Sequence, residues 1–86
     1  MNEAYKPIAC SVYDVLEVAA MGSKRLQLTI QGEQIKVLVK DVYAKGKEEF
    51  LEAVNSITNE QMRIRLDTIE LVFDPVENKS YVPNEC

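Results

Sequence analysis

The chain has 86 residues, enough for one small domain spanning residues 1–86, and its 47% hydrophobic content is that of a folded rather than a disordered protein. With 14 acidic and 10 basic residues, its formal net charge at pH 7 is −4. This balance disfavours a protein whose main task is to hold nucleic acid, because phosphate binding normally needs a net basic face, and it favours a basic protein as the partner.

The first predicted element is a short amphipathic helix over about residues 10–21. Pro7 keeps the preceding segment extended, and Gly22 offers the left-handed conformation in which helices often end. At about 100° per residue, one side of this helix is apolar and the other carries an aromatic ring between two carboxylates. The expected packed side consists of Val12, Val15, Leu16 and Ala19, and the outer side of Tyr13, Asp14, Glu17 and Met21.

Five strands with short connections are predicted after the helix. Most of them alternate apolar and polar residues, as half-buried strands do, and Gly32 marks a hairpin turn between the first two. Asp41 interrupts the inward series of the second strand, which a bulge or the end of the strand explains. The expected ranges are about residues 25–31, 34–43, 48–54, 60–66 and 69–73.

Two of these strands rest on weaker patterns. Residues 48–54 (EEFLEAV) have a helix-forming composition, but the segment is too short between two loop signals for a helix, so we expect a strand with Phe50 inward. The fifth strand is expected to point three apolar side chains inward, namely Ile69, Leu71 and Phe73.

A helix followed by five short strands predicts a mainly β (α+β) fold: a small, strongly bent antiparallel five-stranded barrel with an N-terminal α-helix. The Sm-like barrel is one example, and the periodicity alone does not distinguish it from other five-stranded barrels such as the OB fold. Residues 80–82 are a candidate for a brief additional edge strand.

The residues needed for catalysis are largely missing. The chain has no histidine, its cysteines Cys10 and Cys86 lack metal-binding spacing, and its three glycines stand singly, without a phosphate-binding motif. We therefore expect no enzyme, no cofactor and no metal. The start of the chain lacks the basic and apolar regions of a signal peptide and no apolar run is long enough to span a membrane, so we expect a cytoplasmic protein with reduced thiols.

Two surfaces remain as candidates for binding. The outer side of the helix is either a solvated face, with Tyr13 folded back over the sheet, or a docking surface, since tyrosine is enriched at interface hot spots. Arg63 and Arg65 either join Lys24 and Arg25 in a basic patch or pair with carboxylates on neighbouring strands, which is the interpretation we favour. The candidate carboxylates are Asp67, Glu70 and Glu52.

The beginning of the chain resembles that of a known family, the Rho-binding antiterminators (Rof, also called YaeO). The resemblance rests on the pattern Tyr5-x-Pro7-Ile8-x-Cys10-x-x-Tyr13-Asp14-x-Leu16-Glu17-x-Ala19. It continues through residue 73, with Leu26-x-Leu28, Gly32, Asp41, Phe50-Leu51 and Arg63-x-Arg65-Leu66-Asp67-x-Ile69.

This resemblance implies a monomeric, bacterial, cytoplasmic protein with an Sm-like barrel. It also implies binding to the N-terminal OB-fold domain of the transcription termination factor Rho, where the protein blocks the primary RNA-binding site without itself binding nucleic acid. Tyr13, Asp14 and Glu17 stand at motif positions and are expected to face Rho, together with Met21 beside them and Lys47 in the 44–48 tip. The alternative is an Sm-like RNA-binding ring subunit that holds RNA near Arg63 and Arg65.

Overall fold

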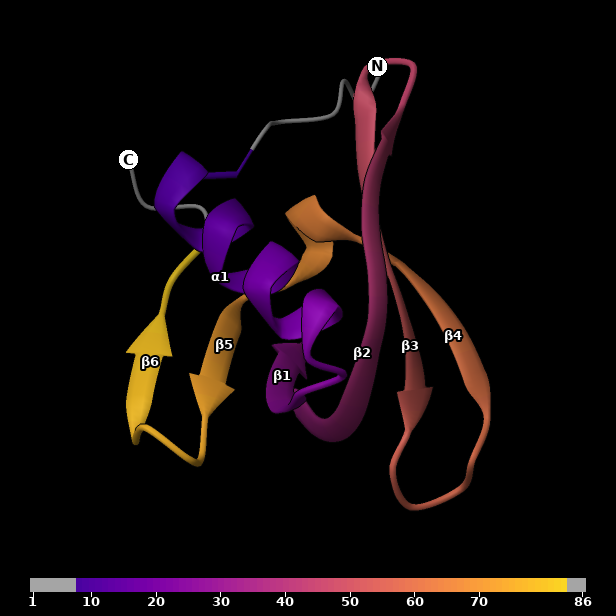
Figure 1. Cartoon of the computed structure of the whole chain (residues 1–86), viewed down its shortest axis with the longest axis vertical. Coiled ribbons are helices and arrows are strands. Elements are labelled where there is room, and N and C mark those ends of the chain that lie inside the picture. Colours follow the sequence, from indigo (N-terminus) through magenta and orange to yellow (C-terminus); the bar gives the residue numbers. More distant parts are fainter. Residues whose placement is uncertain (1–7, 84–86) are drawn as a thin grey trace.

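The computed structural model describes residues 8–83, in which one helix crosses a face of an antiparallel sheet (Figure 1). The helix has the predicted range, and the segment EEFLEAV lies in a strand as expected. The elements are α1 (Cys10–Met21), β1 (Arg25–Ile30), β2 (Glu33–Lys45), β3 (Glu48–Asn55), β4 (Gln61–Arg65), the short 3-10 helix η1 (Leu66–Thr68), β5 (Leu71–Asp74) and β6 (Lys79–Tyr81).

The sheet has the strand order β4-β3-β2-β1-β5-β6 and does not close into a barrel. The predicted mainly β class with an N-terminal helix is confirmed, but the five-stranded barrel is matched only loosely, since the sheet is open and has six strands. The additional strand, β6, pairs with the outer edge of β5. In a closed barrel, β5 would pair with β4. Here β6 occupies that edge of β5, so β4 has no strand on its outer side among residues 8–83.

Helix α1 is fixed by its apolar side, which packs against the core. No side chain caps its N-terminus, and Val12, Leu16 and Ala19 are buried. Val15, expected on the packed side, is only half-buried because it lies on the flank of the helix that faces the β5–β6 hairpin. The start of the helix is also tied to the end of the described chain, where the Ala9 N–H donates to the Pro83 carbonyl oxygen at 2.9 Å.

Two irregularities shape the long strand β2. The turn before it places both Gln31 (φ +52°) and Gly32 (φ +78°) in the left-handed region, which is the geometry of a two-residue type I′ hairpin turn. A shift of register between Val39 and Asp41 indicates a β-bulge, so of the two explanations for the break at Asp41 the structure has the bulge and not the end of the strand. The bulge bends β2, so the strand runs alongside α1 and then projects past it as a hairpin with β3 (Figure 1).

The prediction that Phe50 points inward is wrong. Leu51 and Ala53 are the buried residues of β3, and Phe50 lies on the opposite face, 5.8 Å from the ring of Tyr43 and under the guanidinium of Arg63. The sequence EEFLEAV has apolar residues of both parities, so its pattern does not set the phase. Pairing with β2 sets it instead.

The inward series predicted for the fifth strand is also partly wrong. Ile69 is buried, but within β5 the buried residues are Val72 and Asp74, while Leu71 and Phe73 are half-buried. The reason is the 3-10 turn η1, which places Ile69 before the strand and restarts the alternation at Leu71. Among residues 8–83, no helix is long and apolar enough to cross a membrane.

We expect the Leu16→Ala substitution to lower the free energy of unfolding by about 3 kcal/mol, because it leaves a cavity at a fully buried site. Val18→Ala, on the same helix but at a site 63% exposed, should change it by less than about 0.5 kcal/mol. Urea denaturation followed by circular dichroism measures both. Equal losses in the two variants would contradict the proposed anchoring of α1.

Candidate functional site

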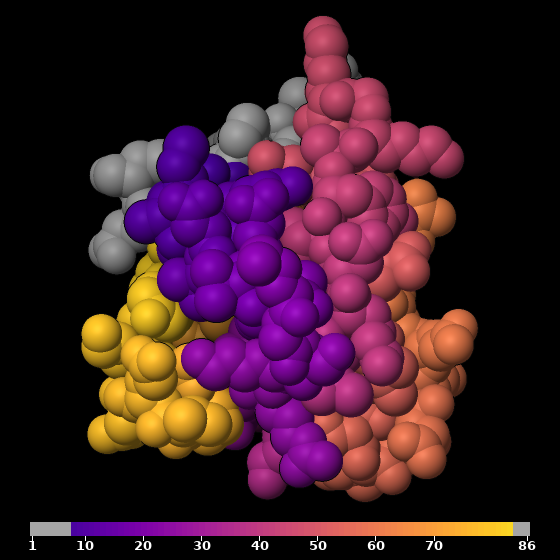
Figure 2. All heavy atoms as spheres, viewed as in Figure 1, coloured from indigo at the N-terminus to yellow at the C-terminus, as the bar shows by residue number. Residues whose placement is uncertain are grey.

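Tyr13 lies at the centre of an acidic surface built from three elements. Its ring is half-buried against the core, on the flank of α1 that faces β2. Burial raises the pKa of the Tyr13 phenol, and the negative charges of Glu17, Glu49 and Asp41 raise it further. The phenol is protonated at neutral pH, as an ordinary tyrosine is, and it can donate a hydrogen bond within the negative field of these three carboxylates. We call Tyr13, Glu17, Asp41 and Glu49 the Tyr13 surface; Figure 2 shows α1 and β2 side by side on this face of the molecule.

The structure separates the residues that the sequence grouped together. Glu17 accompanies Tyr13, and Met21, 86% exposed, stands on the solvent side of the same helix. Asp14 is exposed but lines a hollow on the other flank of α1, next to the β5–β6 hairpin. Lys47 is exposed in the turn at the tip of the β2–β3 hairpin, which projects beyond the helix (Figures 1 and 2).

Asp41 and Glu49 are members of the Tyr13 surface that the sequence did not identify. Asp41 was conspicuous as a polar break in an apolar series, but the break indicated a bulge and not the direction of the side chain. Glu49 is one of two adjacent glutamates in an acidic segment. The pairing of β2 with β3, which sets Ala44 opposite Glu49, and the packing of α1 against β2 together bring these charges within electrostatic reach of Tyr13.

The basic residues do not assemble into a patch. The Arg65 guanidinium donates from Nε and Nη2 to the two carboxylate oxygens of Asp67, each at 2.7 Å, so Arg65 has the predicted aspartate as its partner. The pair is local and not cross-strand, because Asp67 lies two residues later in η1, and Arg63 lies over the Phe50 ring instead. The other two candidate carboxylates have different donors: Glu52 accepts from the Tyr43 hydroxyl at 2.9 Å, and Glu70 accepts from the Gly32 N–H at 3.2 Å.

A partly buried ion pair joins the segment after α1 to the end of β5. The Lys24 ammonium donates to Asp74 Oδ2 at 2.6 Å, while Asp74 Oδ1 accepts from the backbone N–H groups of Val76 and Glu77 at 2.9 and 3.3 Å. Burial by itself would raise the pKa of the Asp74 carboxyl, which is only 2% exposed. The hydrogen bonds from Lys24, Glu77 and Val76 outweigh burial and lower the pKa below its ordinary value.

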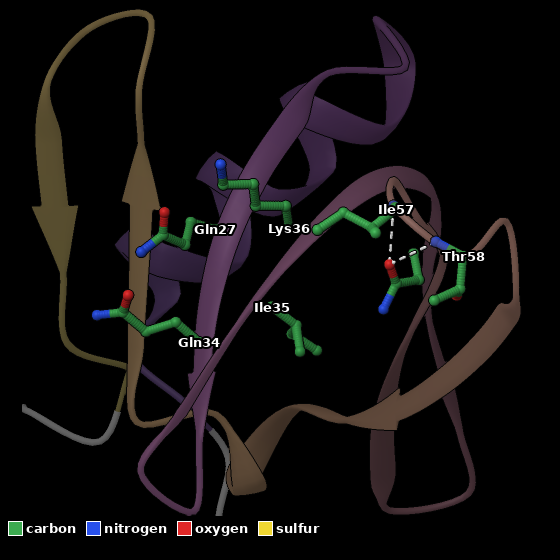
Figure 3. Close-up of a pocket in the computed structure, with 7 residues that line it drawn as sticks. Gln27, Gln34, Ile35, Lys36, Ile57 and Thr58 are labelled. Atoms are coloured by element: carbon green, nitrogen blue, oxygen red, sulfur yellow. Dashed lines mark hydrogen bonds between the residues drawn. The ribbon is translucent and has the colours of Figure 1, made fainter.

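Four hollows lined by residues 8–83 have volumes of about 230 to 290 Å³. The one drawn in Figure 3 has a volume of about 240 Å³, and Gln27, Gln34 and Lys36 border it. In the same hollow, the Asn55 side-chain oxygen is occupied by the backbone N–H groups of Ile57 and Thr58. Within residues 8–83, no group of three or more cysteine or acidic side chains is placed to hold a metal ion. Cys10 is a free, exposed thiol, and Cys86 lies outside the described residues.

Fold and surface together define a small helix-bearing β protein whose prominent feature is a tyrosine set among carboxylates on an open face, an arrangement suited to recognition. Residues 7–81 match the model of a family described as modulator of Rho-dependent transcription termination (ROF). The protein rof of Escherichia coli K12 is 34% identical over 76 residues, which cover 87% of this chain and 88% of the relative, and the protein rof of Shigella flexneri gives the same values. The chain belongs to the ROF family, as its resemblance indicated.

The Lys24–Asp74 pair should make stability depend on pH in acid. Because the folded-state pKa of Asp74 is lowered, its contribution is present above the ordinary carboxyl pKa of 3.8 and is lost as the pH falls through the lowered value. We expect Asp74→Asn, which keeps an acceptor for the turn, to be less stable than the wild type at pH 7 and to lose less stability on acidification to pH 3. Urea denaturation at the two pH values tests this, with Glu60→Gln as an exposed control; parallel curves for wild type and Asp74→Asn would contradict it.

The Tyr13 phenol should respond to carboxylates on a strand far away in sequence. We expect Glu49→Gln to lower the pKa of Tyr13 toward its ordinary value of 10.0 without abolishing the shift, since burial contributes most. A pH titration of the tyrosine Cζ signals by nuclear magnetic resonance (NMR) measures it, with Tyr13→Phe assigning the signal and Glu60→Gln as the control. An unchanged pKa in Glu49→Gln would show that β3 does not contribute to this surface.

Proposed function

We propose that this protein inhibits Rho-dependent transcription termination by binding the N-terminal domain of Rho and blocking its primary RNA-binding site. The observation that carries the proposal is the Tyr13 surface: a rigid aromatic donor surrounded by carboxylates in a chain of the ROF family. The proposal places the protein in the cytoplasm as a monomer, and contact with Rho is assigned to Tyr13, Asp14, Glu17 and Met21, with Lys47 at the edge.

The chemistry of this surface suits a competitor of RNA. A site that binds single-stranded RNA offers positive charge for the phosphates and flat groups on which bases stack. Carboxylates such as Glu17 and Asp41 can pair with that positive charge in place of the phosphates. The Tyr13 ring can stack on the flat groups in place of a base. Because Tyr13 is held by the core, little side-chain freedom is lost on binding, which favours affinity.

The alternative function, an RNA-binding ring subunit, has less support. Two of the cations that would hold RNA form salt bridges within the protein: Arg65 with Asp67 and Lys24 with Asp74. A ring built by pairing strands of adjacent subunits needs two free edges, and the edge beside β5 is occupied by β6, a strand of only three residues that Pro83 follows two positions later.

We expect Tyr13→Ala to weaken binding to full-length Rho by about tenfold or more, because it removes an aromatic anchor that is already ordered. Glu17→Lys should weaken binding further and also reduce its salt dependence, since it reverses a charge at the interface. Fluorescence anisotropy with labelled protein, repeated with a pyrimidine-rich RNA as competitor, measures both effects.

The matched control is Glu60→Lys, which makes the same change of charge in the exposed β3–β4 connection, on the far side of the sheet from β6. It should bind Rho like the wild type. If Rho binding is unchanged in folded Tyr13→Ala and Glu17→Lys, or if bound RNA does not compete, the proposed site is wrong.

A further inference from the structure

A second feature lies on the other flank of α1, away from Tyr13. Asp14 and Val18 of the helix, Lys24 after it, and Asp74, Glu77 and Tyr81 of the β5–β6 hairpin line a groove with a volume of about 230 Å³. We call it the α1–β6 groove. In Figure 2 the helix and the β5–β6 segment form neighbouring parts of the same front face.

The charge of the α1–β6 groove is unbalanced. Lys24 and Asp74 neutralise one another at 2.6 Å, and both oxygens of Asp74 are occupied by hydrogen bonds. Asp14 and Glu77 also line the groove, and their carboxylates are exposed and form no ion pair within residues 8–83. Three carboxylates against one ammonium leave a net charge of −2, carried by groups that are free to bind a cation.

Part of the lining of the α1–β6 groove is apolar. Val18 is 63% exposed, one of the few large hydrophobic residues of the described chain with so much of its surface in water. Tyr81 is half-buried on the hairpin side of the groove. An aliphatic stem ending in a cation would cover the apolar surface while placing its charge beside the carboxylates.

We propose that the α1–β6 groove receives an arginine side chain of the protein partner. A planar guanidinium is weakly hydrated, stacks on an aromatic ring and donates to two carboxylates at once, so it suits Tyr81 together with Asp14 and Glu77 better than a compact, strongly hydrated ammonium does. A drug-sized ligand needs a larger cavity, of about 300 Å³ or more.

This inference rests on the proposed function for the identity of the partner, and it extends the interface across the helix. An α-helix with its side chains is about 10–12 Å across, and a standard interface covers about 800 Å² on each partner. A protein bound to the Tyr13 surface therefore reaches the α1–β6 groove on the other flank without a second binding event. Asp14, which lies apart from Tyr13, then has a role of its own.

The groove is tested without Rho by titrating the isotopically labelled full chain with N-acetyl-arginine methylamide and following the NMR signals of Val18 and Tyr81. We expect saturable shifts of these signals, at least threefold weaker binding in Glu77→Gln, and no change in Glu60→Gln. The citrulline analogue, which has the same shape without the charge, and the lysine analogue should bind at least threefold more weakly than the arginine compound. Absent shifts, shifts centred elsewhere, or equal binding of either analogue would overturn the proposal.

Binding to full-length Rho then separates the two proposals. If the wild type binds Rho, we expect Glu77→Lys to weaken binding about tenfold while Glu60→Lys leaves it unchanged; equal binding by Glu77→Lys and the wild type overturns the role of the groove and leaves the proposed function intact. If the wild type does not bind Rho but the arginine compound binds at Val18 and Tyr81, the proposed function fails and the groove stands as an arginine site for another protein.

Discussion

The structure depends on the packing of one narrow apolar stripe, Val12, Leu16 and Ala19, against the sheet. A helix of 12 residues without a side-chain cap is too short to be stable alone in water, so this contact makes α1 a helix and also fixes its rotation. Once the stripe is buried, the 3.6-residue period fixes the direction in which every other side chain of the helix points. Tyr13 turns toward β2, and Val18 turns toward the β5–β6 hairpin.

Glu17, Glu49 and Asp41 place three negative charges around one phenol, and each of them raises the pKa of Tyr13. The apolar core tolerates this because the charges lie at its rim, where water screens them. A cationic partner would stabilise these like charges when it binds. Two of the cations, Arg65 and Lys24, form salt bridges with Asp67 and Asp74.

The local pattern of apolar residues predicted an element correctly where only one of its faces is buried. It failed where a neighbouring strand decides which residues of a strand point inward. The helix and the first two strands followed from periodicity. The family motif pointed to Tyr13, Asp14 and Glu17, of which the structure places Asp14 on the other flank of the helix. The direction of Phe50 depends on the register with β2, and the phase of β5 depends on η1; neither leaves much trace in the local pattern. The candidate edge strand at residues 80–82 is present as β6, but its pairing with β5, which goes with the open sheet, was not predicted. For the same reason, Asp41 and Glu49 were not identified as neighbours of Tyr13, because three elements far apart in sequence meet there.

The hydrogen bond between Ala9 and Pro83 ties the first turn of α1 to the residues after β6, and the Lys24–Asp74 pair ties the other end of the helix to the end of β5. The helix is thus held at both ends by the same hairpin, which is itself paired with β1. Local opening of the β5–β6 hairpin removes both end contacts at once, although the β1–β4 region separates the helix and the hairpin in sequence. The apolar stripe on the sheet then holds the helix alone, so the order of its two ends depends on the hairpin.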